Sequence, residues 1–387
     1  MDFEKLCFIS KQFFVNCKVL DIEIIDSGCI NSTYIVEHLH NGVKSKFVLQ
    51  SLSKVFKSHE IVIENHKLIT DQMNKIINTN FFIHNSDRWE IPELIKCKSN
   101  NLLIFPFESE FWRAMVYIDE THSFEFLEDK MMAYETGLGL AKFHLLCSDI
   151  DSSKLEESIS NFHDTNYYIE KYLAVIKNFD FTKLNDIKKD RVLNLVNCLK
   201  KHLVYVKSLY KSIINTIHDY NVIHGDPKLS NFLFDIKSKH VVSLIDLDTV
   251  SSGYLLIDLA DCIRSICNLA GEDPHDLDDV SFDINCCKYF LRGYFSIINK
   301  KGNHCFGSLP EFVYLIIVEL TVRFLSDFLQ SNKYFKIKYQ THNLYRAESQ
   351  YRLLSSFVSQ VPIFSNLLQE IGFSSKHTFV SDVQKIV

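Results

Sequence analysis

HGDPKLSN at residues 224–231 and LIDLD at residues 244–248 are the two most informative stretches of this sequence. In the first, the carboxylate of Asp226 follows an apolar segment, and the amide of Asn231 comes five residues later. In the second, an apolar segment ends in the carboxylate of Asp246. In-line phosphoryl transfer needs one acid to orient the attacking hydroxyl, and an amide and a second acid to hold Mg²⁺ on the phosphates. The pattern therefore predicts Asp226 as the catalytic base and Asn231 and Asp246 as metal ligands.

The composition is that of a soluble globular protein. Hydrophobic residues make up 47% and charged residues 23% of 387 residues, and only 11 Gly and 6 Pro are present. A chain of this length exceeds one average domain, so two lobes are expected. The net charge of −6 and the scattered lysines argue against a nucleic-acid partner or an anionic membrane surface.

The cysteines and the hydropathy pattern predict a cytoplasmic protein with reduced thiols. Eleven cysteines include no Cys-x-x-Cys pair, and the adjacent Cys286 and Cys287 cannot form an ordinary disulfide. The first twenty residues lack the apolar core of a secretory signal, and the longest apolar run, residues 312–318, is too short to span a bilayer.

The first part of the chain has the patterns of a small β-rich lobe, which we expect to cover residues 1–118. Alternating apolar and polar residues predict strands at 19–26, 33–38, 46–51, 101–106 and 112–118. A His-Asn-Gly turn at residues 40–42 predicts a hairpin between the second and third of them. Helical spacing of apolar residues predicts one helix at 59–75.

The rest of the chain, residues 119–387, is expected to form a larger helical lobe. Apolar stripes of helical period cover residues 131–147, 166–177, 191–216, 284–298, 311–329 and 346–358. One β-rich island at residues 222–250 interrupts them, and residues 232–235 and 241–245 inside it predict a short hairpin. The predicted fold class is α+β with two lobes, and the catalytic loop lies in the middle of the helical lobe.

These residues resemble the catalytic loop and metal-binding Asp of the aminoglycoside phosphotransferase and choline kinase superfamily, which shares the bilobal protein-kinase-like fold. Protein kinases usually carry Arg where this chain has Gly225. Only about eight residues separate Asp246 from the apolar segment 255–259, so the long activation segment of protein kinases is missing. The resemblance implies a small-molecule kinase and makes Asp258 similar to a structural Asp of the superfamily.

Within the superfamily, blocks along nearly the whole chain resemble N-acetylhexosamine 1-kinases. The blocks lie at residues 27–34, 47–50, 112–113, 161–165, 244–250, 323–329, 334–336 and 342–344. The resemblance implies transfer of the ATP γ-phosphate, with Mg²⁺, to the anomeric hydroxyl of N-acetylglucosamine or N-acetylgalactosamine, giving the sugar 1-phosphate. Its nucleotide-binding residues would be Ser27, Gly28, Gln50, Glu64 and Lys228. Its sugar-binding residues would be Cys29, Asn31, His163, Arg323 and Tyr334.

Two positions depart from common patterns. In many kinases a strand lysine binds the nucleotide phosphates and pairs with a helix glutamate. Gln50 stands at that lysine position, as it does in the hexosamine kinases, while Glu64 stands where the glutamate is expected. Phosphate binding should then depend more on Mg²⁺ and on backbone N–H groups near Gly28, with Lys46 as an alternative cation. Cys29 occupies a place where the family commonly has His, which leaves a different hexose or another polyol open as the acceptor.

Several of these residues also have ordinary structural interpretations. Arg323 fits a helix-surface arginine, and Tyr334 fits a core tyrosine. His144, on an apolar helix, is expected to be a satisfied core histidine. His163 and Asp164 are both placed to face the sugar, and Asp164 is at least as good a candidate for a helix cap.

Two other functions remain open from the sequence. One is a kinase of another small alcohol, such as an aminoglycoside, choline, homoserine or hydroxylysine. Cationic acceptors of this kind need an acidic or aromatic pocket, so an acceptor cleft without clustered carboxylates would disfavour them. The other is a nucleotide-binding pseudokinase, which Gln50 supports and the complete set Asp226, Asn231 and Asp246 opposes.

Overall fold

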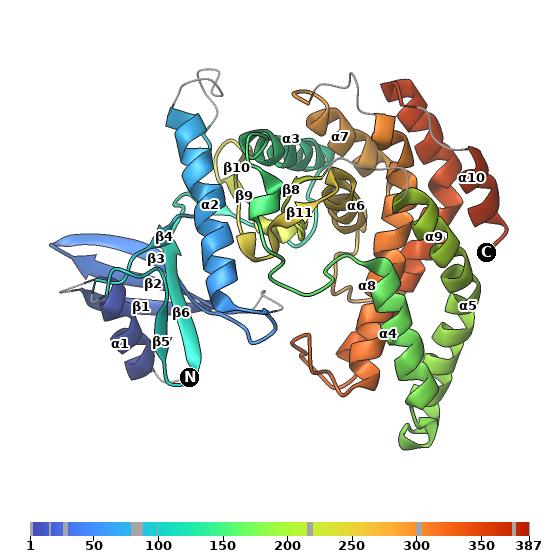
Figure 1. Ribbon diagram of the computed structural model, residues 1–387, viewed down its shortest axis with the longest axis horizontal. Helices are drawn as coiled ribbons and strands as arrows, with labels where there is room; N and C mark the ends of the chain where they lie inside the picture. The colour runs from blue at the N-terminus through green and yellow to red at the C-terminus, as the bar shows by residue number, and fades with distance from the viewer. Residues whose placement is uncertain are drawn as a thin grey trace.

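The computed structural model describes residues 3–14, 17–25, 30–78, 88–98, 100–214, 220–298, 304–373 and 377–386. A small lobe built on an antiparallel sheet lies beside a larger, mainly helical lobe (Figure 1). The predicted α+β fold with two lobes is confirmed. No helix of the described ranges is both long and apolar enough to cross a membrane.

The small lobe is a sheet in the order β1-β2-β3-β6-β4, with β5 paired to β6. Asn41 and Gly42 connect β2 to β3 with φ angles of 51° and 79°, the left-handed pair that a tight hairpin turn requires. Helix α1, which the sequence patterns do not predict, contributes Leu6, Ile9 and Phe13 to the core of this lobe. The strands are β1 (Lys18–Ile25), β2 (Ser32–His40), β3 (Val43–Ser51), β4 (Leu94–Ile95), β5 (Phe105–Phe107) and β6 (Glu110–Val116), and α1 is Phe3–Phe13.

Helix α2 (His59–Asn78) lies between the sheet and the helical lobe (Figure 1). Its buried residues Ile69 and Met73 belong to the core of the large lobe. The amide of Asn65 donates to the carbonyl of Val250 at 3.1 Å, so α2 contacts the segment that follows Asp246. Helix α2 therefore links the small lobe to the catalytic segment.

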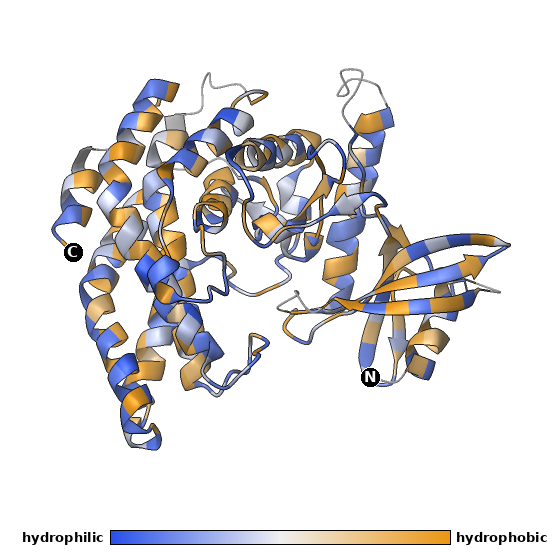
Figure 2. Cartoon of the chain, turned by 180° about the vertical axis from the view of Figure 1, so that it is seen from behind, coloured by the Kyte–Doolittle hydropathy of each residue, from blue (hydrophilic) through white to orange (hydrophobic). Residues whose placement is uncertain are grey.

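The large lobe is assembled around α8 (Leu309–Leu329), which is buried on nearly every side and packs on α4, α6 and α9. Hydrophobic and hydrophilic residues alternate along the surrounding helices, as expected when one face of each is packed inward (Figure 2). The other helices of this lobe are α3 (Lys130–Leu146), α4 (Thr165–Asn178), α5 (Asp186–Ile214), α6 (Leu255–Ile266), α7 (Ile284–Tyr294), α9 (His342–Ile371) and α10 (His377–Gln384).

Two small antiparallel pairs hold the catalytic segments. Strands β9 (Phe232–Asp235) and β10 (Val241–Leu244) form the predicted hairpin, and β7 (Thr121–His122) pairs with β9. Strands β8 (Asn221–Ile223) and β11 (Ser251–Gly253) also pair. The β8–β11 pair brings the start of the 224–231 motif, just after β8, beside the segment that leads from the 244–248 motif into β11.

Several predicted boundaries differ from the structure by a few residues or more. Residues 101–104 are irregular, so the strand predicted at 101–106 is reduced to β5. Helix α7 ends four residues before the predicted end at 298. Helix α9 continues to Ile371 although Pro362 lies inside it, because Phe364 and Leu368 are buried and packing outweighs the propensity cost of proline.

Candidate active site

The catalytic loop begins where β8 ends. Ser251 of β11 pairs with Ile223 of β8, and the hydroxyl of Thr249 donates to the carbonyl of His224 at 2.9 Å. Gly225 has φ +85°, and a Cβ placed on it would lie 2.7 Å from the carbonyl oxygen of Thr249. A glycine is therefore required here on two grounds, backbone conformation and space. The arrangement holds the loop of Asp226 against the segment that follows Asp246.

Asp258, on the first turn of α6, anchors the same loop. Its two carboxylate oxygens accept the backbone N–H groups of His224 at 2.6 Å and Gly225 at 2.8 Å. His144 lies 3.0 Å from the same carboxylate and 2.9 Å from the hydroxyl of Tyr294. Burial alone would raise the pKa of Asp258, but the contacts from His144 and the loop N–H groups hold that pKa below its ordinary value. Asp258 and His144 therefore have the structural roles expected of them.

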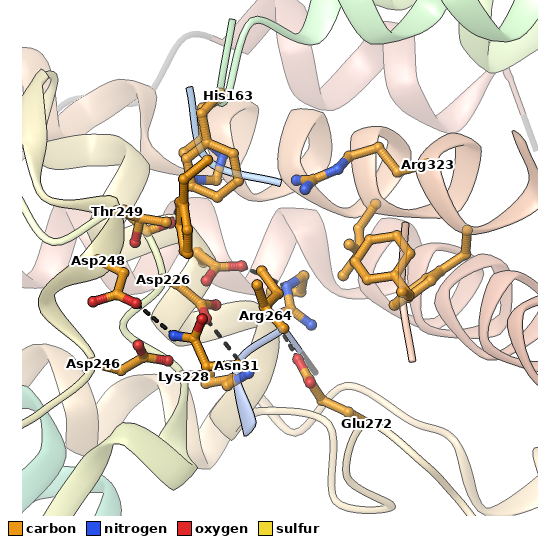
Figure 3. Close-up of a pocket in the computed structure, with 18 of the residues that line it drawn as sticks. Asn31, His163, Asp226, Lys228, Asp246, Asp248, Thr249, Arg264, Glu272 and Arg323 are labelled. Atoms are coloured by element: carbon orange, nitrogen blue, oxygen red, sulfur yellow. Dashed lines mark hydrogen bonds and ion pairs between the residues drawn. The ribbon is translucent and has the colours of Figure 1, made fainter. Parts of the chain in front are cut away.

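Asp226 points from the loop into a cavity between the lobes (Figure 3). Its carboxylate lies 3.4 Å from the ammonium group of Lys228, and 32% of the side chain remains exposed to the cavity. Burial raises the pKa of Asp226, Lys228 opposes this shift, and Asp261 and Glu272 add to it. The amide of Asn231 donates to the backbone carbonyl of Asp226 at 2.7 Å, so the two predicted residues lie together.

Asp246 follows β10 and adopts a left-handed backbone conformation, with φ 66° and ψ 54°. It lines the same cavity as Asp226 (Figure 3). Burial, Asp248 and Asp226 raise the pKa of Asp246 to about 7, while Lys228 and Arg113 lower it. The carboxylates repel one another, and a cation placed between them would relieve this repulsion.

The donor set fits Mg²⁺ held together with a nucleotide. Within the described ranges, no three His, Cys, Asp or Glu side chains converge on a common metal position. Mg²⁺ in kinase sites uses one or two protein ligands and completes its shell with phosphate and water oxygens. One carboxylate from Asp246 and the amide oxygen of Asn231 meet that requirement. The two residues are joined through the backbone, since Ile245 N–H donates to the Asn231 carbonyl at 2.9 Å.

Not all of the predicted nucleotide-binding residues line the cavity. Gln50 lines the cavity, and its amide nitrogen donates to the hydroxyl of Thr33 at 2.9 Å. Glu64, predicted as a nucleotide-binding residue at the place of the helix glutamate, is exposed on α2 and is not among the residues that line the cavity. The reason is the rotation of the helix, which turns Asn65 and His66 inward instead. Ser27 and Gly28, together with the predicted sugar ligand Cys29, lie outside the described residues.

Lys46 does not replace the missing lysine. It is exposed on β3, and its ammonium group lies over the ring of Tyr117 at 5.4 Å from the centroid. Asn31 lines the cavity, but both ends of its amide contact protein: Nδ2 donates to Asp248 at 2.6 Å, and Oδ1 accepts the Ser53 N–H at 3.0 Å. This side chain braces the cavity wall, and its role in binding the acceptor stays a prediction.

His163 also braces the catalytic loop. Its Nε2 lies 2.5 Å from the carbonyl oxygen of Gly225, and its Nδ1 lies 3.6 Å from the carboxylate of Glu319. Burial lowers the pKa of His163, but the contacts with Glu319 outweigh it, and the net shift is upward. The neighbouring Asp164 caps α4 by accepting the Tyr167 N–H at 3.0 Å. The ring of His163 lines the cavity while both of its nitrogens face protein groups.

Arg323 lies across the cavity from Asp226 and Asp246 (Figure 3). It projects from α8, where Nη1 is 3.3 Å from the carboxylate of Glu319. Its guanidinium carbon lies 4.6–5.8 Å from the centroids of four aromatic rings, those of Phe162, Tyr168, Tyr334 and Phe335. The alternative of a solvated surface arginine is therefore wrong. Tyr334 lines an adjoining cavity that shares Arg323 and Phe335 with the first.

The loop that carries Tyr334 depends on Asp327. This buried carboxylate accepts the backbone N–H groups of Lys333, Tyr334 and Phe335 at 2.8–3.0 Å, and the amide of Asn343 at 2.9 Å. The sequence patterns assign no role to Asp327. Its position near the end of α8, four residues after Arg323, could have indicated such a role.

The cavity contains further charged residues that the sequence analysis does not single out. Arg264 is buried on α6 and makes ion pairs with Asp261 at 2.7 Å and Glu272 at 2.9 Å. Arg346, on α9, lines the cavity and pairs with Asp273 at 2.7 Å. These residues are distant in sequence and belong to no compact motif.

One carboxylate just after β8 and a second just after β10, in a cleft between a sheet lobe and a helical lobe, are the arrangement expected of protein-kinase-like phosphotransferases. The comparison with family models agrees with this class. The model of the phosphotransferase enzyme family APH matches residues 21–277, more than half of the chain. The chain belongs to that family.

Solved structures share the fold at low sequence identity. A spectinomycin phosphotransferase, APH(9)-Ia, in complex with ADP and spectinomycin has 13% identity and a TM-score of 0.58, covering 92% of this chain and 97% of its own. A microcompartment-associated aminopropanol kinase has 13% identity and a TM-score of 0.59, covering 92% and 98%. The ethanolamine kinase of Plasmodium vivax has 15% identity and a TM-score of 0.56, covering 90% and 84%. The family model confirms the expected phosphotransferase family, the solved structures confirm the fold, and the N-acetylhexosamine subtype stays a prediction.

Proposed function

We propose that this chain is a small-molecule kinase that transfers the ATP γ-phosphate to the anomeric hydroxyl of an N-acetylhexosamine. The observation that carries the proposal is a single cavity in which Asp226 and Asp246 face Arg323 across the space for an acceptor. The family and the fold support phosphoryl transfer to an alcohol. The ADP in the spectinomycin phosphotransferase supports an adenine nucleotide as donor.

The catalytic step would use the loop geometry directly. Asp226 would accept a hydrogen bond from the acceptor hydroxyl, orient it toward the γ-phosphorus and take up its proton as the new P–O bond forms. The bond between the γ-phosphorus and the β,γ-bridging oxygen would break in the same step, and ADP would leave. Asn231 and Asp246 would hold Mg²⁺, which neutralises charge on the nucleotide phosphates when bound. Lys228 opposes the rise in the pKa of Asp226 and so favours the ionised base. The nucleotide would lie between the lobes near residues 112–118, with the lobe boundary at residue 118.

The charges around the cavity support a neutral acceptor. Its carboxylates beyond Asp226 and Asp246 are already paired: Asp248 with Arg113, and Asp261 and Glu272 with Arg264. An aminoglycoside or a choline-like acceptor would need unpaired carboxylates or an empty aromatic box. Here the aromatic box is filled by the guanidinium of Arg323 itself.

Arg323 supports a polyhydroxylated acceptor in particular. A guanidinium has five N–H donors in a planar fork, which suits the ring and carbonyl oxygens of an N-acetylated sugar. The phenyl rings of Phe56, Phe162 and Phe335 line the same space and offer flat apolar surface to a sugar face. The pseudokinase alternative is opposed by the assembled group of Asp226, Asn231 and Asp246.

The direct test is a panel of acceptors incubated with ATP and Mg²⁺, with products identified by mass and by phosphorus NMR. We expect a sugar 1-phosphate from N-acetylglucosamine or N-acetylgalactosamine, and no product from choline, aminoglycosides or amino alcohols. Asp226→Asn should lower kcat by about 10³-fold or more while nucleotide binding persists. Asp246→Ala should abolish the thermal stabilisation that ATP and Mg²⁺ confer. Product from a cationic alcohol alone would refute the sugar assignment, and full turnover by Asp226→Asn would refute the mechanism.

A further inference from the structure

Position 50 lacks the lysine of other kinases, but an arginine lies directly across the sheet from it. Gln50 on β3 pairs in register with Arg113 on β6. The Nε and Nη2 groups of Arg113 donate to the amide oxygen of Gln50 at 3.0 and 2.7 Å. The amide nitrogen of Gln50 is held by Thr33 on the other neighbouring strand. Gln50 is thus fixed from both sides, and Arg113 provides two of the three side-chain hydrogen bonds that Gln50 makes with the part of the chain the structure describes.

The same arginine reaches the large lobe. Nη2 of Arg113 lies 2.5 Å from a carboxylate oxygen of Asp248, two residues after Asp246. The other oxygen of Asp248 accepts the amide of Asn31 (Figure 3). Arg113 therefore joins the strand that carries Gln50 to the segment that carries Asp246.

Burial makes this contact electrostatically significant. The side chain of Arg113 is 0% exposed and that of Asp248 is 4% exposed. Charges that are shielded from water interact far more strongly than a surface pair. A buried arginine is also held in one geometry by its planar fork, which a lysine ammonium would not provide.

Arg113 does not itself line the cavity, whereas Gln50 and Asp248 do. Arg113 therefore acts on the cavity through its two partners, Gln50 and Asp248. In many kinases the strand lysine both contacts the phosphates and forms an ion pair that ties the small lobe to the active arrangement. Arg113 places a guanidinium beside position 50, and its ion pair with Asp248 ties the two lobes together.

We propose that Arg113 is the positioning residue that replaces the strand lysine: through Gln50 and Asp248 it aligns the two walls between which the nucleotide phosphates bind. The inference rests on the proposed phosphotransferase function and goes beyond it, because it assigns the missing cation to a neighbouring strand. It predicts that Arg113 governs the affinity for MgATP much more than the affinity for the acceptor.

The test compares four variants with the wild-type chain: Arg113→Met, Arg113→Lys, the double variant Arg113→Met with Gln50→Lys, and Arg88→Met. Arg88 is the matched control, since its Nη1 also links the lobes, to Asp235 at 3.0 Å, away from this cavity. Dissociation constants for MgATP are measured by calorimetry, and KM for acceptor and nucleotide by steady-state kinetics. Thermal unfolding verifies that each variant is folded.

We expect Arg113→Met to weaken MgATP binding roughly tenfold or more, because truncating one partner of a buried charge pair commonly has an effect of this size. KM for the acceptor should stay within about threefold, and Arg88→Met should resemble the wild type. Adding Gln50→Lys should restore part of the nucleotide affinity, since it returns a cation to the strand. Arg113→Lys should lie between the wild type and Arg113→Met.

Three results would overturn the inference: unchanged MgATP affinity in a folded Arg113 variant, equal weakening of nucleotide and acceptor, or no recovery with Gln50→Lys. If Arg113→Met does not fold, the affinities for MgATP and for the acceptor are compared in Arg113→Lys and Gln50→Ala instead. Equal weakening of both affinities in these two variants would overturn the inference. Absence of MgATP binding by the wild-type chain would instead refute the proposed function. The two failures are therefore distinguishable.

Discussion

Replacing Asp258 by Asn tests whether one buried carboxylate holds the catalytic loop. The carboxylate is 0% exposed and accepts two consecutive backbone N–H groups, of His224 and Gly225, besides facing His144. Asparagine has nearly the same volume but only one acceptor oxygen. Its NH₂ group must then face one of the loop N–H groups or the ring of His144.

The expected cost follows from these contacts. A hydrogen bond to a charged group contributes about 1.5–3 kcal/mol, and a buried N–H left without a partner costs about 1–3 kcal/mol. We expect Asp258→Asn to lower the free energy of unfolding by about 3 kcal/mol at pH 7. The loop of Asp226 would also shift, and misplacement of a catalytic group by about 1 Å can lower kcat about 10²-fold.

The assay is urea unfolding, with kcat measured on the same samples. Because the pKa of Asp258 lies below its ordinary value of 3.8 in the folded chain, its stabilising contribution is present above pH 3.8 and is lost as the pH falls through the folded-state pKa. The stability difference between wild type and Asp258→Asn should therefore be constant near neutrality and shrink in acid. Asp278→Asn, at a largely exposed ion pair, is the control and should change stability by less than about 0.5 kcal/mol. A difference below about 1 kcal/mol for Asp258→Asn, with unchanged kcat, would refute the reasoning.

Three further substitutions have defined outcomes. Gly225→Ala forces a Cβ against the Thr249 carbonyl at φ +85°, so stability should fall by about 1–3 kcal/mol and kcat by more than tenfold, measured by unfolding and steady-state kinetics. Gly137→Ala places a methyl group in the backbone of α7 where α3 crosses it, and thermal unfolding should show a loss of about 3 kcal/mol or more; a stable variant would contradict this packing. Asp327→Ala removes the acceptor for the N–H groups around Tyr334 and should raise KM for the acceptor about tenfold while KM for ATP stays constant; an equal rise in both would contradict the assignment.

The catalytic loop could be predicted because its geometry is local. Asp226 and Asn231 are five residues apart, and the hydrogen bond between them forms within a single turn. Asp246 is placed by the β9–β10 hairpin, in which Leu244, two residues before it, pairs with Phe232. The order of the two lobes and the apolar faces of the helices can likewise be predicted from short windows of sequence.

The support around that loop could not be predicted, because it joins distant segments. Glu64 was expected to face the nucleotide, but the rotation of α2 is set by packing of Ile69 and Met73 against the large lobe, which leaves Glu64 in solvent. The aromatic surroundings of Arg323 come from two segments of the chain far apart in sequence, residues 162–168 and 334–335. No window of the sequence contains these partners together.

The sequence by itself predicted the chemistry: a base, an amide and a second carboxylate at the spacings expected of a phosphoryl-transfer loop. The tertiary structure alone decided what surrounds that chemistry. It placed Arg113 behind Gln50 and against Asp248, and it filled an aromatic box with Arg323. The physical reason is that hydrogen bonds within a turn are set by neighbouring residues, whereas buried ion pairs and cation–aromatic contacts depend on how whole strands and helices pack.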